Sequence, residues 1–151
     1  MLMVVPLNSM AQDYDKGMAA ARTGDFETAL NELGPLAEQG HGDAQNSLGT
    51  IYRNGEGVAQ DYPEAARWFR LAAEQGNPFA QFNLGKNYYL GIGLAQNNIS
   101  ALMWWAITAA QGDQDADENI GYLASEISKN DLLNGLRRAR VCMESNYTNR
   151  D

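Results

Sequence analysis

Residues 44–76, AQNSLGTIYRNGEGVAQDYPEAARWFRLAAEQG, return as residues 80–112, AQFNLGKNYYLGIGLAQNNISALMWWAITAAQG, and this repetition is the strongest indication of the protein's architecture. The two copies align at a shift of 36 residues, which takes Ala44 to Ala80. A fixed period of about 20 to 50 residues is typical of an array of stacked structural units. The shared positions are Ala44, Leu48, Gly49, Tyr52, Gly55, Gly57, Gln60, Ala65, Trp68, Ala73, Gln75 and Gly76, which return as Ala80, Leu84, Gly85, Tyr88, Gly91, Gly93, Gln96, Ala101, Trp104, Ala109, Gln111 and Gly112.

Each copy predicts a pair of helices joined by a glycine loop. Ala44, Leu48 and Tyr52 lie four residues apart and therefore share one helix face. Ala65 and Ala72 lie on the apolar stripe of the second helix. The two stripes predict a helical hairpin with one buried seam.

Gly49 and Gly85 sit beside the predicted seam, where a missing side chain lets the partner helix approach closely. In the loop, Gly55 can take the positive φ that ends a helix. Asp61 and Glu64 are spaced as an N-cap with its reciprocal glutamate.

Together these residues spell A-x-x-x-L-G-x-x-Y, then G-x-G-V, then A-x-x-W and A-A-x-Q-G, and this pattern resembles the Sel1-like repeat family. Leu94 in place of Val and Thr108 in place of Ala are mild departures. The resemblance implies an all-α, right-handed α/α superhelical solenoid of Sel1-like, tetratricopeptide-like hairpins with a C-terminal capping helix. It also implies an inner surface that recruits partner proteins or peptides.

The flanking sequence extends the array on both sides. Shifting back by 36 predicts an earlier second helix from Asp25 to Gln39, and shifting forward places a terminal cap from about residue 114. The apolar stripe expected for the last helix is Leu132, Leu136, Ala139 and Met143. We expect one repeat domain over residues 12–151, with hairpins at about 12–40, 43–76 and 79–112 and a cap at 114–145.

Composition narrows the function. The formal charge is −8, which repels phosphate backbones, so nucleic acid is not an expected partner. No apolar run approaches the roughly 18 residues of a membrane span. Cys142 is the single cysteine, so a multi-cysteine metal site is not available. We expect no metal and no cofactor.

The N-terminus resembles the remnant of an export signal over residues 1–11. Residues 1–7 are apolar, and Ser9, Met10 and Ala11 supply small residues at the spacing of a cleavage site, which would leave Gln12 first. No Lys or Arg precedes the apolar run, so a cytoplasmic chain is the alternative. The expectation is a periplasmic or otherwise exported protein.

Motifs that could carry chemistry have simpler explanations. His41 is the single histidine and lies between glycines in a turn, so no histidine relay can form. Asp113, Asp115 and Asp117 imitate a calcium loop but lack its glycine and its final glutamate, and they suit a helix N-terminus. The tryptophans, Trp68, Trp104 and Trp105, and the thiol of Cys142 are expected in or beside the core. No catalytic residues are predicted.

The expected function is therefore a non-catalytic adaptor that binds a protein or peptide on the concave face. The alternative is a self-associating structural module, which would form a homo-oligomer. A hydrolase is a remote third reading, since some cysteine-rich relatives are linked to β-lactam chemistry and this chain has one cysteine. Whether the inner aromatics bind a partner or pack against a neighbouring unit stays open at this stage. The predicted concave residues are Tyr14, Met18, Asn46, Thr50, Arg53, Phe79, Phe82, Lys86, Tyr89, Glu118 and Tyr122.

Overall fold

The computed structural model describes residues 7–147, with side chains from Tyr14 onward. Over these residues every regular element is a helix. The helices are α1 (Leu7–Thr23), α2 (Phe26–Glu38), α3 (Gly42–Asn54), α4 (Tyr62–Glu74), α5 (Pro78–Leu90), α6 (Asn98–Ala110), α7 (Gln114–Glu126) and α8 (Lys129–Glu144).

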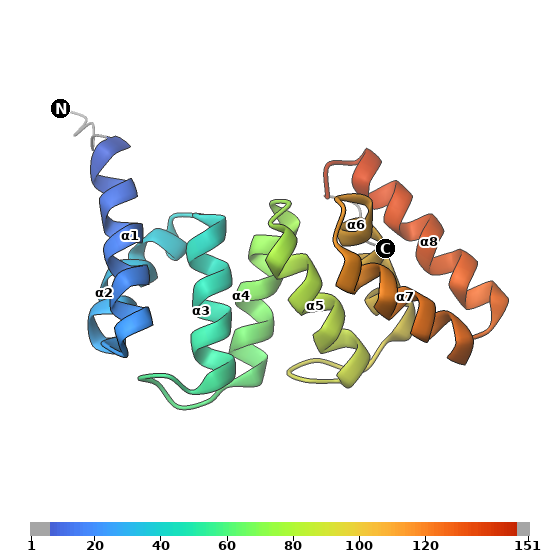
Figure 1. Ribbon diagram of the computed structural model, residues 1–151, viewed down its shortest axis with the longest axis horizontal. Coiled ribbons are helices and arrows are strands. Elements are labelled where there is room, and N and C mark those ends of the chain that lie inside the picture. Colours follow the sequence, from blue (N-terminus) through green and yellow to red (C-terminus); the bar gives the residue numbers. More distant parts are fainter. Residues whose placement is uncertain (1–6, 148–151) are drawn as a thin grey trace.

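The helices form hairpins that stack along the long axis of the molecule (Figure 1). The pairs α1–α2, α3–α4 and α5–α6 pack most closely, and α2–α3, α4–α5 and α6–α7 join one hairpin to the next. From α1 to α7 each helix therefore contacts mainly its neighbours in sequence, as in other solenoids. The predicted all-α solenoid is confirmed.

The repeated glycines permit close packing within the hairpins, as predicted. A Cβ added at Gly49 would lie 2.6 Å from the ring of Phe69, and one added at Gly85 would lie 2.7 Å from the ring of Trp105. Both rings are buried against the first helix of their own hairpin. The glycine thus exchanges some helix propensity for a large aromatic contact.

The N-cap of α4 is confirmed, but the reciprocal glutamate is not. Asp61 accepts a hydrogen bond from the backbone N–H of Glu64 at 2.9 Å. The Glu64 carboxylate instead pairs with Arg67, 2.7 Å away, and this pairing lowers the pKa of Glu64. The backbone N–H of Asp61 donates to the carbonyl of Tyr52 at 2.9 Å, so a capping glutamate has no donor left to satisfy.

Two buried glutamines, Gln45 and Gln81, each tie their own hairpin to the one before it. Gln45 donates to the carbonyl of Ala37 at 3.0 Å and accepts from Gln75 at 2.7 Å. The same bonds recur one unit later, where Gln81 accepts from Gln111 at 2.8 Å. These bonds satisfy backbone and amide groups that would otherwise be buried without partners.

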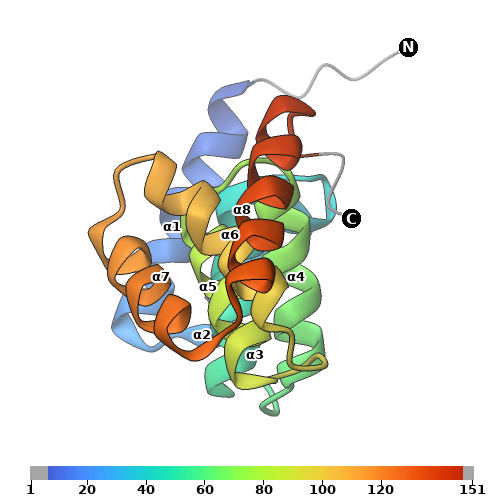
Figure 2. The ribbon, with the colours of Figure 1, turned by 90° about the vertical axis from the view of Figure 1, so that its right-hand side faces the viewer.

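The last helix packs differently from the sequence expectation. Its buried residues are Gly135, Ala139 and Cys142, whereas Leu136 and Met143 are exposed, so the predicted apolar stripe is wrong at these two positions. The reason is a close approach between α8 and α6, because a Cβ at Gly135 would lie 2.5 Å from the side chain of Leu102. The main partner of α8 is α6, which it flanks at the end of the array (Figures 1 and 2).

Among the described residues, no helix combines the length and apolar character needed to cross a bilayer. The predicted export signal falls on residues 1–11, of which 1–6 lie outside the described residues.

Candidate functional site

A groove of about 380 Å³ opens between α5 and α7 on the inner face of the solenoid. One wall comes from α5 and the other from α7, while Trp105 of α6 lies beneath them. The groove is therefore built by a repeat and the first helix of the cap. Its lining residues are Phe82, Lys86, Tyr89, Leu90, Trp105, Asp115, Glu118, Asn119 and Tyr122.

The floor of the groove is a set of aromatic rings held by the repeat itself. The missing side chain of Gly85 lets the Trp105 ring lie against α5, and Trp105 Nε1 donates to the carbonyl of Phe82 at 3.3 Å. Tyr89 contacts Trp105 at 5.6 Å between ring centroids and Tyr122 at 6.5 Å in an edge-to-face arrangement. These contacts hold the rings next to one another, so a ligand would meet an aromatic surface that is already formed.

The groove gathers a subset of the predicted concave residues. Phe82 and Tyr89 pack against the core cluster below and also line the groove, so the packing interpretation holds and leaves part of each ring at the groove. Tyr122 is 59% exposed and offers most of its ring to solvent. The predicted residues brought together here are Phe82, Lys86, Tyr89, Glu118 and Tyr122.

The structure adds residues that sequence reasoning missed. Trp105 was interpreted as core, and it is buried, yet it also lines the groove. Asp115 was interpreted as an N-terminal helix acid, and it lies one turn before Glu118 on the same face. The one-turn spacing between Asp115 and Glu118 was the feature of the sequence that could have identified Asp115 as a lining residue. Leu90 and Asn119 complete the set.

Arg53 lies in an adjoining hollow of about 490 Å³ that shares Lys86 and Leu90 with the groove. Its guanidinium donates to Asn83 at 2.8 Å, lies 5.3 Å from the Phe69 ring, and has its pKa lowered by burial.

Asn46 does not line the groove. Its side-chain oxygen accepts a hydrogen bond from Asn83 at 3.4 Å. Thr50 is half-buried and donates to the backbone carbonyl of Asn46 at 3.3 Å. These two residues support the inner face without reaching the groove.

Three further predicted residues lie apart from the groove. Tyr14 stacks on His41 at 4.9 Å between ring centroids, and Met18 accepts a hydrogen bond from Ser47 at 3.2 Å. Both are half-buried and pack against the core of the first two hairpins. Phe79 is 68% exposed at the start of α5 but does not line the groove.

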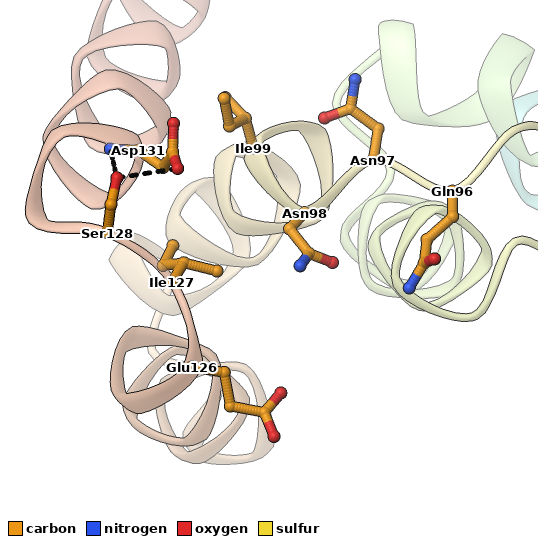
Figure 3. Close-up of a pocket in the computed structure, with 8 residues that line it drawn as sticks. All are labelled: Gln96, Asn97, Asn98, Ile99, Glu126, Ile127, Ser128 and Asp131. Carbon is orange, nitrogen blue, oxygen red and sulfur yellow. Dashed lines mark hydrogen bonds between the residues drawn. The ribbon is translucent and has the colours of Figure 1, made fainter.

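A second hollow of about 500 Å³ lies where the connection between α7 and α8 meets the start of α6 (Figure 3). Gln96 in its wall donates to the carbonyl of Tyr89, a residue of the groove, at 2.9 Å. Figure 3 shows Asn98 and Glu126 approaching the same opening from different helices. Its opposite side carries Asp131, whose carboxylate accepts a hydrogen bond from Ser128 at 2.8 Å.

The residues considered for chemistry have structural roles. The Nδ1 of His41 accepts from the backbone N–H of Ala44 at 3.2 Å and caps α3. Asp113 caps α7 in the same way at 2.8 Å. Cys142 is fully buried, and burial raises the pKa of its thiol. Within residues 14–147 no group of three acidic, cysteine or histidine side chains could hold a metal ion.

The fold and the groove define a helical-repeat solenoid with an aromatic, acidic inner groove. Comparison with family models finds the Sel1 repeat at residues 42–77 and 78–113. The chain belongs to the Sel1 repeat family, whose repeats are generally non-catalytic modules that mediate protein interactions.

Solved structures agree with this assignment. The Sel1 repeat protein from Oxalobacter formigenes is 31% identical, with a TM-score of 0.67, over 73% of this chain and 86% of that one. A protective antigen present in uropathogenic Escherichia coli strains, which displays an SLR fold, is 25% identical with a TM-score of 0.85 over 91% of this chain. This chain spans 31% of that antigen's length. No curated protein matches the sequence.

Proposed function

We propose that this chain is a non-catalytic adaptor that binds a partner protein in the groove between α5 and α7. The observation that carries the proposal is the aromatic floor of Tyr89, Trp105 and Tyr122 in the groove between α5 and α7. Aromatic residues supply a large contact area at low entropic cost and are enriched among the side chains that dominate binding energy. The family's general role as an interaction module supports the same function.

The proposed setting is the cell envelope, because the N-terminal sequence resembles an export signal ending at Ala11. A partner of an exported adaptor would then be recovered from the envelope fraction of the native host.

The test is quantitative capture of a partner by immobilised protein from envelope and cytoplasmic fractions. Tyr122→Ala removes a ring that is 59% exposed, so the fold should survive, which circular dichroism would verify. If the ring is an anchor, the partner should bind more weakly by about 1 to 2 kcal/mol or more. Phe79→Ala is the matched control, because Phe79 is an exposed aromatic of α5 outside the groove.

The proposal predicts that Phe79→Ala captures the partner as the parent does while Tyr122→Ala does not. Loss of capture with Phe79→Ala and retention with Tyr122→Ala would move the contact away from the groove. A partner recovered only from the cytoplasmic fraction would contradict the proposed compartment.

Self-association is the second candidate, and one observation favours it. The outer face of α8 exposes three large apolar side chains, Leu133 at 55%, Leu136 at 40% and Met143 at 37%. Exposed apolar groups on a terminal helix are typical of contact surfaces. In the capture experiment this alternative would appear as recovery of the chain's own mass and no other protein.

A further inference from the structure

The inner face of α7 carries a regular stripe of acidic and aromatic side chains. Asp115, Glu118, Tyr122 and Glu126 follow one another at intervals of three or four residues and so lie on one side of the helix. The first three line the groove, and Glu126 lines the second hollow near the start of α6. Tyr122 and Glu126 are four positions apart and are therefore neighbours along the stripe. The groove and the hollow therefore follow one another along this face of α7, and the two together are called the channel below.

The charge of this channel is unbalanced. Its walls hold the carboxylates of Asp115, Glu118, Glu126 and Asp131, and Lys86 is the one cation among the residues that line it. The ion pairs Lys16–Glu32, between α1 and α2, and Glu64–Arg67, within α4, lie away from the channel. A ligand that brings positive charge would therefore meet four carboxylates and a single protein cation, Lys86.

An unsatisfied acceptor points to the same ligand chemistry. The Oδ1 atom of Asn98 is buried and receives no hydrogen bond, although its side chain lines the hollow (Figure 3). A buried acceptor without a donor is unfavourable, and an N–H group from a bound molecule would relieve it. Lysine, arginine and backbone amides all supply such donors.

The aromatic floor of the groove determines which apolar side chain a ligand needs. The rings of Tyr89, Trp105 and Tyr122 form an open aromatic surface at the centre of the groove. Such a surface takes an aromatic or large aliphatic side chain, and its ring faces also attract cations.

The length of the channel limits the ligand. Asp115 and Glu126 are eleven positions apart on α7, which is roughly 16 Å along a helix axis. An extended polypeptide covers this distance with about five residues.

Building on the proposed function, we infer that the groove recognises an extended basic segment of its partner. Lysine or arginine side chains of this segment face Asp115, Glu118 and Glu126, and one aromatic or large aliphatic side chain rests on the ring floor. A second copy of this chain is disfavoured as the occupant, because its net charge of −8 repels the acidic channel.

The inference is tested with fluorescein-labelled peptides of about seven residues. One peptide carries a phenylalanine flanked by lysines, a second replaces the lysines with glutamates, and a third replaces the phenylalanine with alanine. Fluorescence polarisation measures their binding to the whole chain at low and high NaCl. We expect the first peptide to bind most tightly and to lose affinity at high salt, because salt screens exposed charges.

Variants separate recognition from general charge attraction. Glu118→Gln should weaken binding of the first peptide by roughly three- to tenfold at low salt. Asp117→Asn removes one charge from the same helix outside the channel, so it should leave the affinity unchanged. Tyr122→Ala should reduce the advantage of the phenylalanine peptide over the alanine peptide.

Equal binding of the basic and acidic peptides would overturn the inference, as would equal effects of Glu118→Gln and Asp117→Asn. Dimers of the unliganded chain that the basic peptide disrupts would assign the channel to a second copy and also overturn it. If Glu118→Gln captures the native partner fully while Tyr122→Ala does not, the groove remains the binding site and only the basic character of the ligand is refuted.

Discussion

The clearest contrast at the scale of single residues is between two glycines at equivalent repeat positions. Gly85 faces the buried Trp105 ring, and an added Cβ would lie 2.7 Å from it. Gly121 lies 36 residues later, and an added Cβ would meet nothing within 4 Å. The difference arises because α5 is paired with α6 in a hairpin, whereas α8 packs on α6 and leaves that side of α7 open.

We predict that alanine has opposite effects at these two positions. Gly121→Ala should stabilise the protein by roughly 0.5 to 1 kcal/mol, since alanine is the better helix former and has room. Gly85→Ala should destabilise it, because overpacking by a methyl group costs about 1 to 3 kcal/mol and exceeds the gain in propensity. The melting temperatures of the two variants, measured by thermal unfolding, test these opposite changes in stability. An unchanged or higher melting temperature for Gly85→Ala would refute the packing role of the glycine.

The sequence predicts residue roles well where the repeat is regular. Gly49 and Gly85 were assigned to the seam from their positions, and the structure confirms both. The role of Glu64 was predicted wrongly, because the carbonyl of Tyr52 that replaces it comes from the preceding helix and cannot be found by local spacing. Gln45 and Gln81 also recur at the repeat period, but their hydrogen bonds to the neighbouring hairpin depend on tertiary contacts.

At the scale of elements, α8 shows where hydrophobicity alone misleads. The sequence predicted a buried stripe of Leu132, Leu136, Ala139 and Met143, and of these the helix buries Ala139, together with Gly135 and Cys142. Small side chains let α8 approach α6 closely, and two of the larger ones, Leu136 and Met143, remain exposed. In the sequence of α8 a stripe of small residues lies beside the apolar stripe. Which of the two stripes is buried depends on the position of α6.

We predict that Gly135→Ala weakens the attachment of α8 more than Leu136→Ala does. An added methyl at Gly135 would meet Leu102 at 2.5 Å, with an expected cost of about 1 to 3 kcal/mol. Leu136 is 40% exposed, so its truncation should cost less than about 1 kcal/mol. Urea unfolding gives both free energies, and hydrogen exchange should show faster exchange in α8 for Gly135→Ala. A larger loss of unfolding free energy for Leu136→Ala than for Gly135→Ala would instead support the predicted stripe of large residues.

At the scale of the whole molecule, the array of hairpins follows from the periodicity of the sequence. The groove forms where the last full repeat, with α5, meets the first helix of the cap, α7. The 36-residue shift was enough to predict stacked hairpins, because each unit contacts mainly its neighbours. The groove was predicted in part, since the inward positions of α5 and α7 could be read from the repeat. Trp105 was missed as a lining residue because a buried ring can still form the floor of an open groove.

The central claim is that the groove between α5 and α7, and not the outer face of α8, contacts a partner protein. Site-specific photocrosslinking in the native host tests it most directly, with a photoreactive amino acid replacing Tyr122 in the groove or Leu133 on α8. Both positions are more than half exposed, so each can carry the probe without burial. We predict covalent adducts with another protein from position 122 and none from position 133. Adducts from position 133 alone, or adducts from position 122 with only a second copy of this chain, would contradict the account.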